Sequence, residues 1–582
     1  MVIAAPASGS GKTTVATGLI GALRRSGSSV APFKVGPDYI DPGYHGLAAG
    51  RPGRNLDTVL VGPDRIGPLY RHGTAGCDIA VVEGVMGLFD GKIDEANSQP
   101  SAEGSTAQVA SILGSPVVLV IDARGHSQSL AAVLHGFATY DAGVRIGGVI
   151  LNRVGSARHE QVLRHACDKV GVAVLGVVPR LTELEVPSRH LGLIPAAEHG
   201  AAAVAAVDAM SDLIASHVDL GAVRALAASN VSAAAWDPVA EVGAHAESRP
   251  VVAMAGGPAF TFGYAEHREL LTAAGADVQV FDPLRDELPA GTAALVLPGG
   301  FPEEHAVDLA ANTVLLQQVR DLADGGAPIH AECAGLLYLA RSLDGHSMAG
   351  VVGVDATFGK RLTLGYREAV AISDSSLFDA GSRVTGHEFH RTSLVSADAD
   401  GCGSAWGGGP GTAAVSAKDL FAAASTRRIS TLIRWGSPNR SRSSSMPHGD
   451  DLCIGVGFTT SVTAKDIVAA VKAVPAAQGK IVVLATVAAK AESSALLTAA
   501  HELNVPIVSF APDVLARVQV PSPSPRVENA VGTASVAEAA AILASGGGRL
   551  VLAKTARDGV TVAAARKVPS SLTNSDNETE CE

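Results

Sequence analysis

The stretch that decides the fold is "MVIAAPASGSGKTT", residues 1–14. It opens with a short apolar run, continues as a loop rich in Gly and Ser, and leads into the helical pattern "TVATGLIGALRRSG". A glycine-rich loop between a strand and a helix lets backbone N–H groups and the positive end of the helix dipole surround phosphate oxygens. The stretch therefore predicts a nucleotide phosphate loop (P-loop) at the carboxyl edge of a parallel sheet.

The residue types in this loop match the chemistry of phosphate binding. Gly9 and Gly11 let the backbone approach the phosphates, and Lys12 can reach the outer ones. The Thr13 hydroxyl can join the oxygen shell of a Mg²⁺ ion. The strict pattern has glycine where this chain has Pro6, and a plain Gly/Ser turn is disfavoured by Gly-Lys-Thr-Thr at a strand end. The predicted nucleotide-binding residues of this loop are Gly9, Ser10, Gly11, Lys12, Thr13 and Thr14, with Mg²⁺ as the accompanying ion.

The rest of the chain alternates apolar runs with helical patterns, which is typical of α/β domains. The runs "CDIAVVEG", "SPVVLVIDA", "VRIGGVILN" and "VAVLGVVP" extend the first alternation. A second includes "PVVAMAG", "GADVQVFDP" and "AALVLPGG", and a third begins at "LCIGVGF". We therefore expect a doubly wound parallel sheet, a second α/β domain and a small C-terminal α/β domain. The predicted segments are domains at 1–200, 250–434 and 452–567, linkers at 201–249 and 435–451, and a polar tail at 568–582.

Composition excludes several classes of function. The 582 residues suffice for several domains, and 47% hydrophobic with 4% aromatic residues fits Val-rich strands and Ala-rich helices. The net charge of −12 argues against a nucleic-acid surface. The six cysteines are scattered without a CxxC or metal spacing, which indicates reduced thiols. We find no apolar run that could span a bilayer, so we expect a cytoplasmic protein without membrane or nucleic-acid partners. The sequence leaves a homodimer open.

Two acidic loops follow the predicted strands of the first domain. "KVGPDYIDPGYH" carries Asp38 and Asp41, and "VVEGVMGLFDG" carries Glu83 and Asp90. Ligands of open α/β sheets bind beyond the carboxyl ends of the strands, where acids can hold Mg²⁺ on a triphosphate. An isolated acid in a turn is more often a cap or a solvated side chain. Two such loops beside a P-loop favour the functional interpretation.

These motifs have a specific resemblance. "APASGSGKTT", "KVGPDYIDPGYH", "NLDTVL", "VVEGVMGLFDG", "GSTAQVA", "GVILNRVGSARHE" and "PSRHLGL" occur in the order found in cobyrinic acid a,c-diamide synthases, and the resemblance covers almost all of residues 1–420. It implies that ATP phosphorylates two acetate carboxylates of a corrinoid and that ammonia then displaces phosphate. The implied catalytic acids are Asp38, Asp41, Glu83 and Asp90, the implied substrate residue is Tyr39, the implied further contact to ATP is Asn152, and the implied Mg²⁺ ligands are Thr13, Asp41 and Glu83.

A cysteine marks the second domain. In "APIHAECAGLLYLA", Cys333 lies between a strand-like run and a helical pattern, where a helix N-terminus favours a thiolate. Upstream, Gly299 and Gly300 could form an oxyanion hole and contact the substrate. A small buried hydrophobe is the alternative role for a lone cysteine. The segment resembles the class I glutamine amidotransferase domain of the same synthases, which implies that Cys333 releases ammonia from glutamine.

A thiol nucleophile also needs a base. The family keeps a histidine in a late "SYLHLH"-like stretch, and "DLFAAASTRRISTLIRWGSPNRSRSSS" stands there without one. His387 and His390, in "TGHEFHRTSL", belong to a separate motif that we expect to line the corrinoid or the domain interface. The sequence therefore leaves both glutamine and free ammonia open as nitrogen sources.

The third domain resembles another group of proteins. "LCIGVGFTTSVTAKDI" and "RLVLAKTARDGVTVAAAR" are similar to the cobalamin-biosynthesis protein CobE and to the C-terminal domain of CbiG. Glu492 and the loop 455–460 could contact a corrinoid or be ordinary turn residues. Three functions stay open: the a,c-diamidation of a corrinoid with or without cobalt, amidation of another tetrapyrrole, and a non-catalytic corrinoid carrier.

Overall fold

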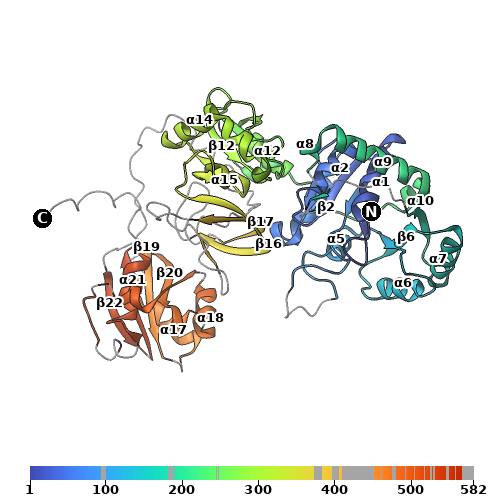
Figure 1. Ribbon diagram of the computed structural model, residues 1–582. Helices are drawn as coiled ribbons and strands as arrows, with labels where there is room; N and C mark the ends of the chain where they lie inside the picture. Colours follow the sequence, from blue (N-terminus) through green and yellow to red (C-terminus); the bar gives the residue numbers. More distant parts are fainter. Residues whose placement is uncertain are drawn as a thin grey trace. The chain divides into compact units, whose positions relative to one another are not determined.

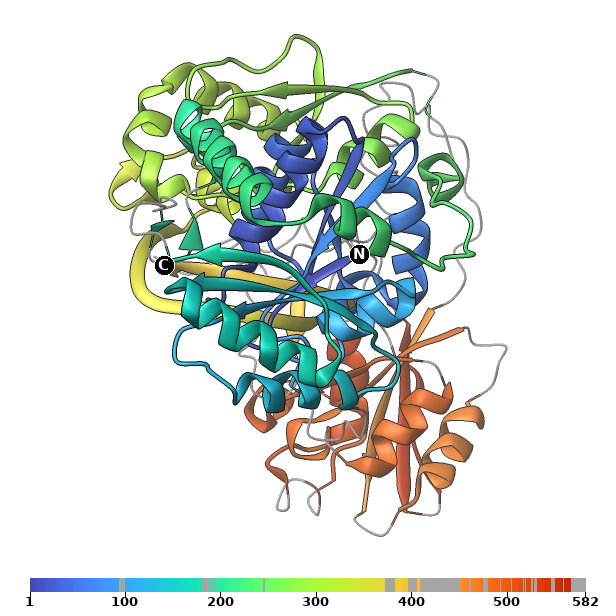
Figure 2. The same cartoon turned by 90° about the vertical axis from the view of Figure 1, so that its right-hand side faces the viewer.

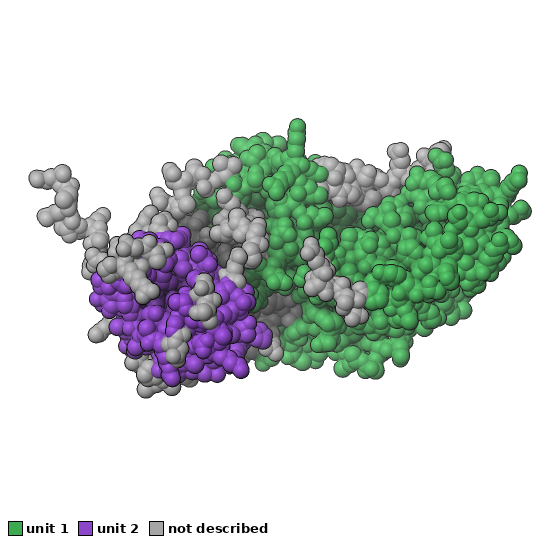
Figure 3. All heavy atoms as spheres, turned by 90° about the horizontal axis from the view of Figure 1, so that it is seen from below, with its two compact units in different colours: residues 1–439 green, residues 440–582 purple. Residues whose placement is uncertain are grey.

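The computed structural model describes most of the chain. The residues outside the description are 94–99, 181–187, 190–191, 194, 244–245, 247, 372–382, 396–405, 409–450, 460–461, 475–479, 492, 504, 517, 519, 525–526, 528–530, 546–549, 558 and 567–582. The predicted linker 435–451, except for its last residue, the predicted tail and Glu492 thus lie outside the described residues. The chain divides into two compact units, residues 1–439 and 440–582 (Figure 3).

The first part of unit 1 contains a seven-stranded parallel sheet in the order β3-β2-β4-β1-β5-β6-β7 (Figure 1). Its strands are β1 (Val2–Ala4), β2 (Val30–Val35), β3 (Arg54–Leu56), β4 (Ile79–Glu83), β5 (Val117–Asp122), β6 (Ile146–Val154) and β7 (Val174–Pro179). The predicted doubly wound sheet is confirmed. The quoted apolar runs miss β2 and β3, because β2 contains a proline and a lysine and β3 is three residues long.

Helices cover both faces of this sheet. One apolar core lies between the sheet and α1 (Lys12–Arg25), α2 (Asp41–Ala49) and α9 (Ala201–His217). The other lies beneath α4 (Ile66–Gly73), α5 (Thr106–Leu113), α6 (Leu130–Thr139) and α7 (Ala157–Val170). The turned view in Figure 2 shows the two helical layers. Because strand order reverses beside β1, the loop after β1 opens at the centre of the carboxyl edge.

The predicted linker 201–249 is wrong for its helical part. It contains α9, α10 (Leu220–Leu226) and α11 (Pro238–Val242). A side chain at Gly18 would overlap the backbone of Met210, and one at Gly21 would overlap Ser211. These glycines let α9 lie close along α1 (Figure 1). The Ala-rich composition that suggested a linker instead belongs to a closely packed helix.

The second part of unit 1 contains a parallel sheet in the order β11-β10-β12-β13. Its elements include β10 (Val251–Ala255), β11 (Asp277–Phe281), β12 (Thr292–Leu297), β13 (Ile329–Ala331), α12 (Ala265–Ala273), α14 (Thr313–Asp324) and α15 (Ala334–Leu339). An antiparallel pair follows, β16 (Asp355–Ala371) and β17 (Arg383–Val395). The predicted α/β domain is confirmed, and the sequence analysis missed the long antiparallel pair.

Unit 2 has a mixed five-stranded sheet in the order β21-β20-β19-β23-β22. Its elements include β19 (Asp451–Phe458), α17 (Ala464–Lys472), β20 (Lys480–Val487), α18 (Ser494–Leu503), β21 (Ile507–Phe510), α21 (Val536–Ala544), β22 (Leu550–Arg557) and β23 (Val560–Arg566). The small C-terminal α/β domain is therefore confirmed. Among the helices that the structure describes in both units, none is long enough and apolar enough to span a membrane.

Candidate active site

The loop after β1 has the geometry of a phosphate-binding loop. Gly9 and Gly11 adopt left-handed backbone conformations, with φ of 79° and 94°, and α1 begins at the next residue, Lys12. Asn152, in β6, donates from Nδ2 to the Ser10 carbonyl oxygen at 3.0 Å. A Cβ atom at Gly11 would overlap the Asn152 amide, so only glycine fits there. Asn152 thus holds the backbone of the predicted loop in place.

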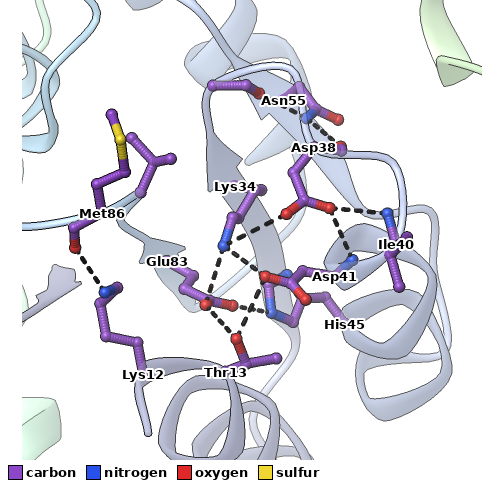
Figure 4. Close-up of polar contacts among 12 residues, drawn as sticks. Lys12, Thr13, Lys34, Asp38, Ile40, Asp41, His45, Asn55, Glu83 and Met86 are labelled. Carbon is purple, nitrogen blue, oxygen red and sulfur yellow. Dashed lines mark hydrogen bonds and ion pairs between the residues drawn. The ribbon is translucent and has the colours of Figure 1, made fainter. Parts of the chain in front are cut away.

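Lys12 is held by backbone carbonyl groups. Its Nζ atom donates to the Met86 oxygen at 2.6 Å, a contact drawn in Figure 4, and to the Ala7 oxygen at 3.4 Å. Met86 has a positive φ of 46°, a strained conformation for a residue with a side chain. Burial and the charge of Lys34 lower the pKa of Lys12. Phosphate oxygens in this position could replace the carbonyl partners of the lysine.

Three residues predicted to bind Mg²⁺ lie together. Thr13, at the start of α1, donates from Oγ1 to Glu83 Oε1 at 2.7 Å and to Asp41 Oδ2 at 3.2 Å. Glu83 ends β4 and Asp41 begins α2, so neighbouring parallel strands and helices bring them to one edge (Figure 4). Thr14 lies in the same first turn of α1. Oxygen donors of this kind suit Mg²⁺ that is also held by phosphates.

The sequence analysis assigned no role to Lys34, which lies at the centre of this cluster. Its buried Nζ atom is 2.5 Å from Asp41 Oδ2, 3.0 Å from Glu83 Oε1 and 3.9 Å from Asp38 Oδ2. Burial opposes its charge, but the Asp41 and Glu83 carboxylates raise the pKa of Lys34. A lysine inside an apolar strand, directly before an acidic loop, was the available signal.

The two buried carboxylates have different environments. Burial raises the pKa of Asp41 to about 7, and the nearby Asp38 and Glu83 carboxylates add to this effect. Burial would raise the pKa of Glu83 too, but Lys34 and His45 hold it well below its usual range. His45 Nε2, another group without a predicted role, is 2.7 Å from Glu83 Oε2. The surroundings therefore favour the charged form of Glu83 and oppose that of Asp41.

Asp38 and Asp90 each also have a structural task. Asp38 Oδ1 accepts hydrogen bonds from the backbone N–H groups of Ile40 at 2.8 Å and Asp41 at 3.1 Å. Asp90 is exposed, and its Oδ2 accepts the Gly87 N–H at 3.0 Å. Both arrangements match the turn-capping alternative. A catalytic role for either acid stays a prediction.

Cys333 has the strand–turn–helix setting of a reactive thiol. It joins β13 to α15 with φ of 47°, a strained conformation for a non-glycine residue. The Gly300 and Ala334 N–H groups donate to its sulfur, and Gly299 lies beside it on the cavity wall. Burial and the Glu303 carboxylate raise the pKa of the Cys333 thiol to about 12. The N–H group of Ala334, at the start of α15, lowers the pKa of the thiol as expected, but burial outweighs this contribution.

A cavity of about 50 Å³ connects this thiol with residues from distant parts of the chain. Tyr39 lines it and stacks on Phe262, with ring centroids 5.0 Å apart. His387 and His390, from β17, line the same cavity as Cys333. Burial and Arg367 lower the pKa of His387 to about 4. The sequence analysis assigned these histidines to a motif separate from the cysteine and did not predict that they share a cavity with it. The segment that replaces the family's histidine lies outside the described residues.

The described residues also test whether the protein alone could hold a metal. Within them, no group of three or more His, Cys, Asp or Glu side chains has a metal-binding arrangement. Thr13, Asp41 and Glu83 offer two carboxylates and a hydroxyl, which suits a metal that arrives with a nucleotide rather than an all-protein site.

The fold and these two sites indicate a protein with a nucleotide-binding part and an amidotransferase part. Family models agree along the chain: the CobQ/CobB/MinD/ParA nucleotide binding domain matches residues 1–194, and the CobB/CobQ-like glutamine amidotransferase domain matches residues 251–411. The model of the cobalamin synthesis G C-terminus matches residues 452–565.

Curated relatives are similar over most of their length. The hydrogenobyrinate a,c-diamide synthase of Mycobacterium tuberculosis is 64% identical over 398 residues, covering 68% of this chain and 87% of the relative. The enzyme of the same name from Streptomyces coelicolor is 56% identical over 439 residues, covering 70% and 89%. The chain belongs to the family of hydrogenobyrinate and cobyrinate a,c-diamide synthases. A solved structure of CobE, "a protein from the cobalamin (vitamin B12) biosynthetic pathway", is 30% identical over 22% of this chain and 98% of its own, with a TM-score of 0.20.

Proposed function

We propose that this protein uses ATP and Mg²⁺ to amidate the a- and c-acetate carboxylates of hydrogenobyrinate or cobyrinate. The single observation that carries the proposal is the convergence of Thr13, Asp41, Glu83 and Lys34 beside the P-loop. It combines a phosphate-binding loop with oxygen ligands and a buried cation, which carboxylate activation requires. Family membership supports the choice of substrate.

The proposed reaction has two steps for each carboxylate. A substrate carboxylate oxygen attacks the γ-phosphorus of ATP, the bond to the bridging oxygen breaks, and ADP leaves. Ammonia then attacks the acyl carbon, phosphate leaves, and the nitrogen loses a proton to give the amide. Mg²⁺, held by Thr13, Glu83 and Asp41 together with the phosphates, would neutralise charge on the transferred group. Lys12 would exchange its carbonyl partners for phosphate oxygens.

The nitrogen source depends on Cys333. With its pKa raised to about 12, the thiol needs a base before it can attack the amide carbon of glutamine. Free ammonia needs no such activation by this cysteine. We therefore propose that ammonia supports the reaction directly, and that glutamine supports it only if His387 or His390 in the same cavity, or another base, can take the proton of Cys333. We propose a cytoplasmic location because ATP and glutamine are supplied there.

The test is amide formation on hydrogenobyrinate and cobyrinate with ATP and Mg²⁺, in parallel with glutamine and with ammonium. We expect product with ammonium in the parent protein and in Cys333→Ala, and no product in Lys12→Ala. Glutamine-dependent product that Cys333→Ala abolishes would identify a working amidotransferase. Absence of product with either source, while corrinoid still binds, would overturn the proposal in favour of a corrinoid carrier.

A further inference from the structure

Residues 54–57, "RNLD", connect the two parts of unit 1. Arg54, Asn55 and Leu56 form β3, the edge strand of the first sheet, and Asp57 follows directly. β3 pairs in parallel with β2, so that Asn55 lies opposite Lys34 in the register. Arg54 and the motif NLDTVL that follows it have no role in the steps above, yet Arg54, Asn55 and Asp57 are each bonded to a different element.

Asn55 holds the acidic loop through its amide. Its Nδ2 atom donates to the carbonyl oxygens of Gly36 and Asp38, both at 2.7 Å (Figure 4 shows the contact with Asp38). A primary amide has two N–H donors, and both are used here. Because the Asp38 carboxylate in turn caps the start of α2 at Ile40 and Asp41, Asn55 sets the position of both predicted acids in this loop.

Arg54 fastens the strand to the amidotransferase part. Its guanidinium pairs with Glu266 at 2.6 Å and with Glu269, both on α12. The Arg54 and Glu266 side chains are only 12% and 16% exposed, so solvent screens this pair less than a surface ion pair. His72, from α4, is 3.0 Å from the same Glu269. The contact is thus a partly buried ionic network that joins β3, α4 and α12.

Asp57 makes the second attachment. Its Oδ1 atom caps the short helix α3 (Thr58–Val61), accepting the Val59 N–H at 2.8 Å and the Leu60 N–H at 3.0 Å. Its other oxygen, Oδ2, accepts the hydroxyl of Tyr366 in β16 at 2.9 Å. The amidotransferase part therefore holds β3 at both ends, and Asn55 lies between the two attachments.

We propose that residues 54–57 are a coupling strand. Through this strand the amidotransferase part positions the acidic loop of the synthetase part that carries Asp38 and Asp41, and Asn55 is the positioning residue. The proposal deepens the proposed function and rests on it. Its consequence is specific: amidation with ammonium, which bypasses Cys333, still depends on the contact between Arg54 and α12. The amidotransferase part then contributes to the synthetase reaction even when its own thiol is unused.

Arg54→Met and Arg25→Met form a matched pair for the test. Arg25 also pairs with two carboxylates, Asp208 and Asp212, but these lie on α9 within the synthetase part. We expect Arg54→Met to lower ammonium-dependent kcat/KM for the corrinoid about tenfold, since small displacements of positioned groups cost up to about 100-fold in rate. The KM for ATP stays within twofold. Arg25→Met leaves both values within twofold.

Asn55→Asp keeps the size of the side chain and replaces two donors by acceptors that face two carbonyl oxygens. It should lower the same kcat/KM more than Arg54→Met does, again with little change in the KM for ATP. Adding Arg54→Met to Asn55→Asp should cost less than the product of the single effects, because both act on one strand. If the double variant loses the full product of the two single effects, or if Arg54→Met and Arg25→Met have equal effects, the proposed coupling strand is wrong.

Amide hydrogen exchange tests the proposal without catalysis. Peptides that span residues 36–41 should exchange faster in Arg54→Met than in the parent protein or Arg25→Met, while those from β5 stay unchanged. An unchanged 36–41 segment in Arg54→Met overturns the coupling strand. A parent protein without ammonium-dependent product overturns only the proposed function, because the exchange experiment still decides whether Arg54 holds the loop.

Discussion

The P-loop site and the Cys333 site each place a reactive group, but the surrounding residues stabilise charge at the first site and oppose it at the second. At the P-loop, Lys34 lies among Asp38, Asp41 and Glu83, so that buried charges compensate one another. At Cys333, the backbone is strained and N–H donors are present, but burial and Glu303 oppose the thiolate. The first site is organised before substrate arrives, whereas the second has its nucleophile in place and its charge suppressed.

The difference shows that geometry and electrostatics can be fixed independently. The strained conformation of Cys333 needs only the strand–turn–helix framework of β13 and α15. A thiolate also needs a nearby positive charge or a base, and this framework does not by itself supply one.

The largest effect is expected for Gly11→Ala. Its Cβ atom would meet the Asn152 amide in a backbone conformation with φ of 94°. Displacement of the loop should lower ammonium-dependent kcat/KM by about 100-fold or more, with loss of ATP binding. Gly27→Ala is the control, because Gly27 has the same φ at the other end of α1 with open space around it. If both variants lose the same activity, the effect comes from backbone strain and not from the contact of the loop with Asn152.

Lys34→Met should cost the most stability among single changes at the acidic cluster. It removes the buried cation and leaves Asp41 and Glu83 facing each other, and breaking a buried pair costs about 3–5 kcal/mol. Urea unfolding and ammonium-dependent turnover measure the effect, with exposed Lys169→Met as the control. Lys34→Met with Asp41→Asn should regain part of the stability, because one of the unpaired charges is then absent. A single variant as stable as the parent would show that Lys34 does not compensate these carboxylates.

Much of this molecule could be predicted from local patterns. The apolar runs located β1 and β4–β7, and the Gly-Lys-Thr motif located the P-loop, because strand burial and loop geometry depend on nearby residues. The acids Asp41 and Glu83 were found because parallel strands align their carboxyl ends. Their shared partner Lys34 was missed. Its position in an apolar strand directly before an acidic loop was a signal, but the local sequence does not show that Asp41 and Glu83 both contact it.

The wrong predictions have tertiary causes. The Ala-rich segment after residue 200 was interpreted as a linker because composition does not reveal that Gly18 and Gly21 leave room for it on α1. The thiolate at Cys333 was expected from the local helix N-terminus, but the burial that opposes it comes from residues far away in the chain. The expectation that His387 and His390 line the domain interface agrees with the structure, because they share a cavity with Tyr39 and Cys333. Their closeness to the thiol was not predicted, because it depends on β17.

The smallest effect is expected at Cys333 itself. Burial is the main cause of its raised pKa and Glu303 is the next, so Glu303→Gln should lower the pKa of the thiol from about 12 while burial keeps it above its usual range. The thiolate fraction, and with it the rate of iodoacetamide alkylation at pH 8.5, should rise by about two- to tenfold, since one pKa unit is a tenfold change. Mass spectrometry of the Cys333 peptide measures this rate.

The control for this change is Glu304→Gln, which removes a charge from the exposed neighbour on the same turn. If both variants react at the parent rate, Glu303 has no influence on the thiol and burial alone suppresses its charge. If Glu303→Gln alone reacts faster but glutamine-dependent amidation does not increase, the thiolate is not what limits this site. The use of glutamine is then limited by the acceptor that must take the proton of the thiol. The P-loop site differs, because its buried charges already compensate one another.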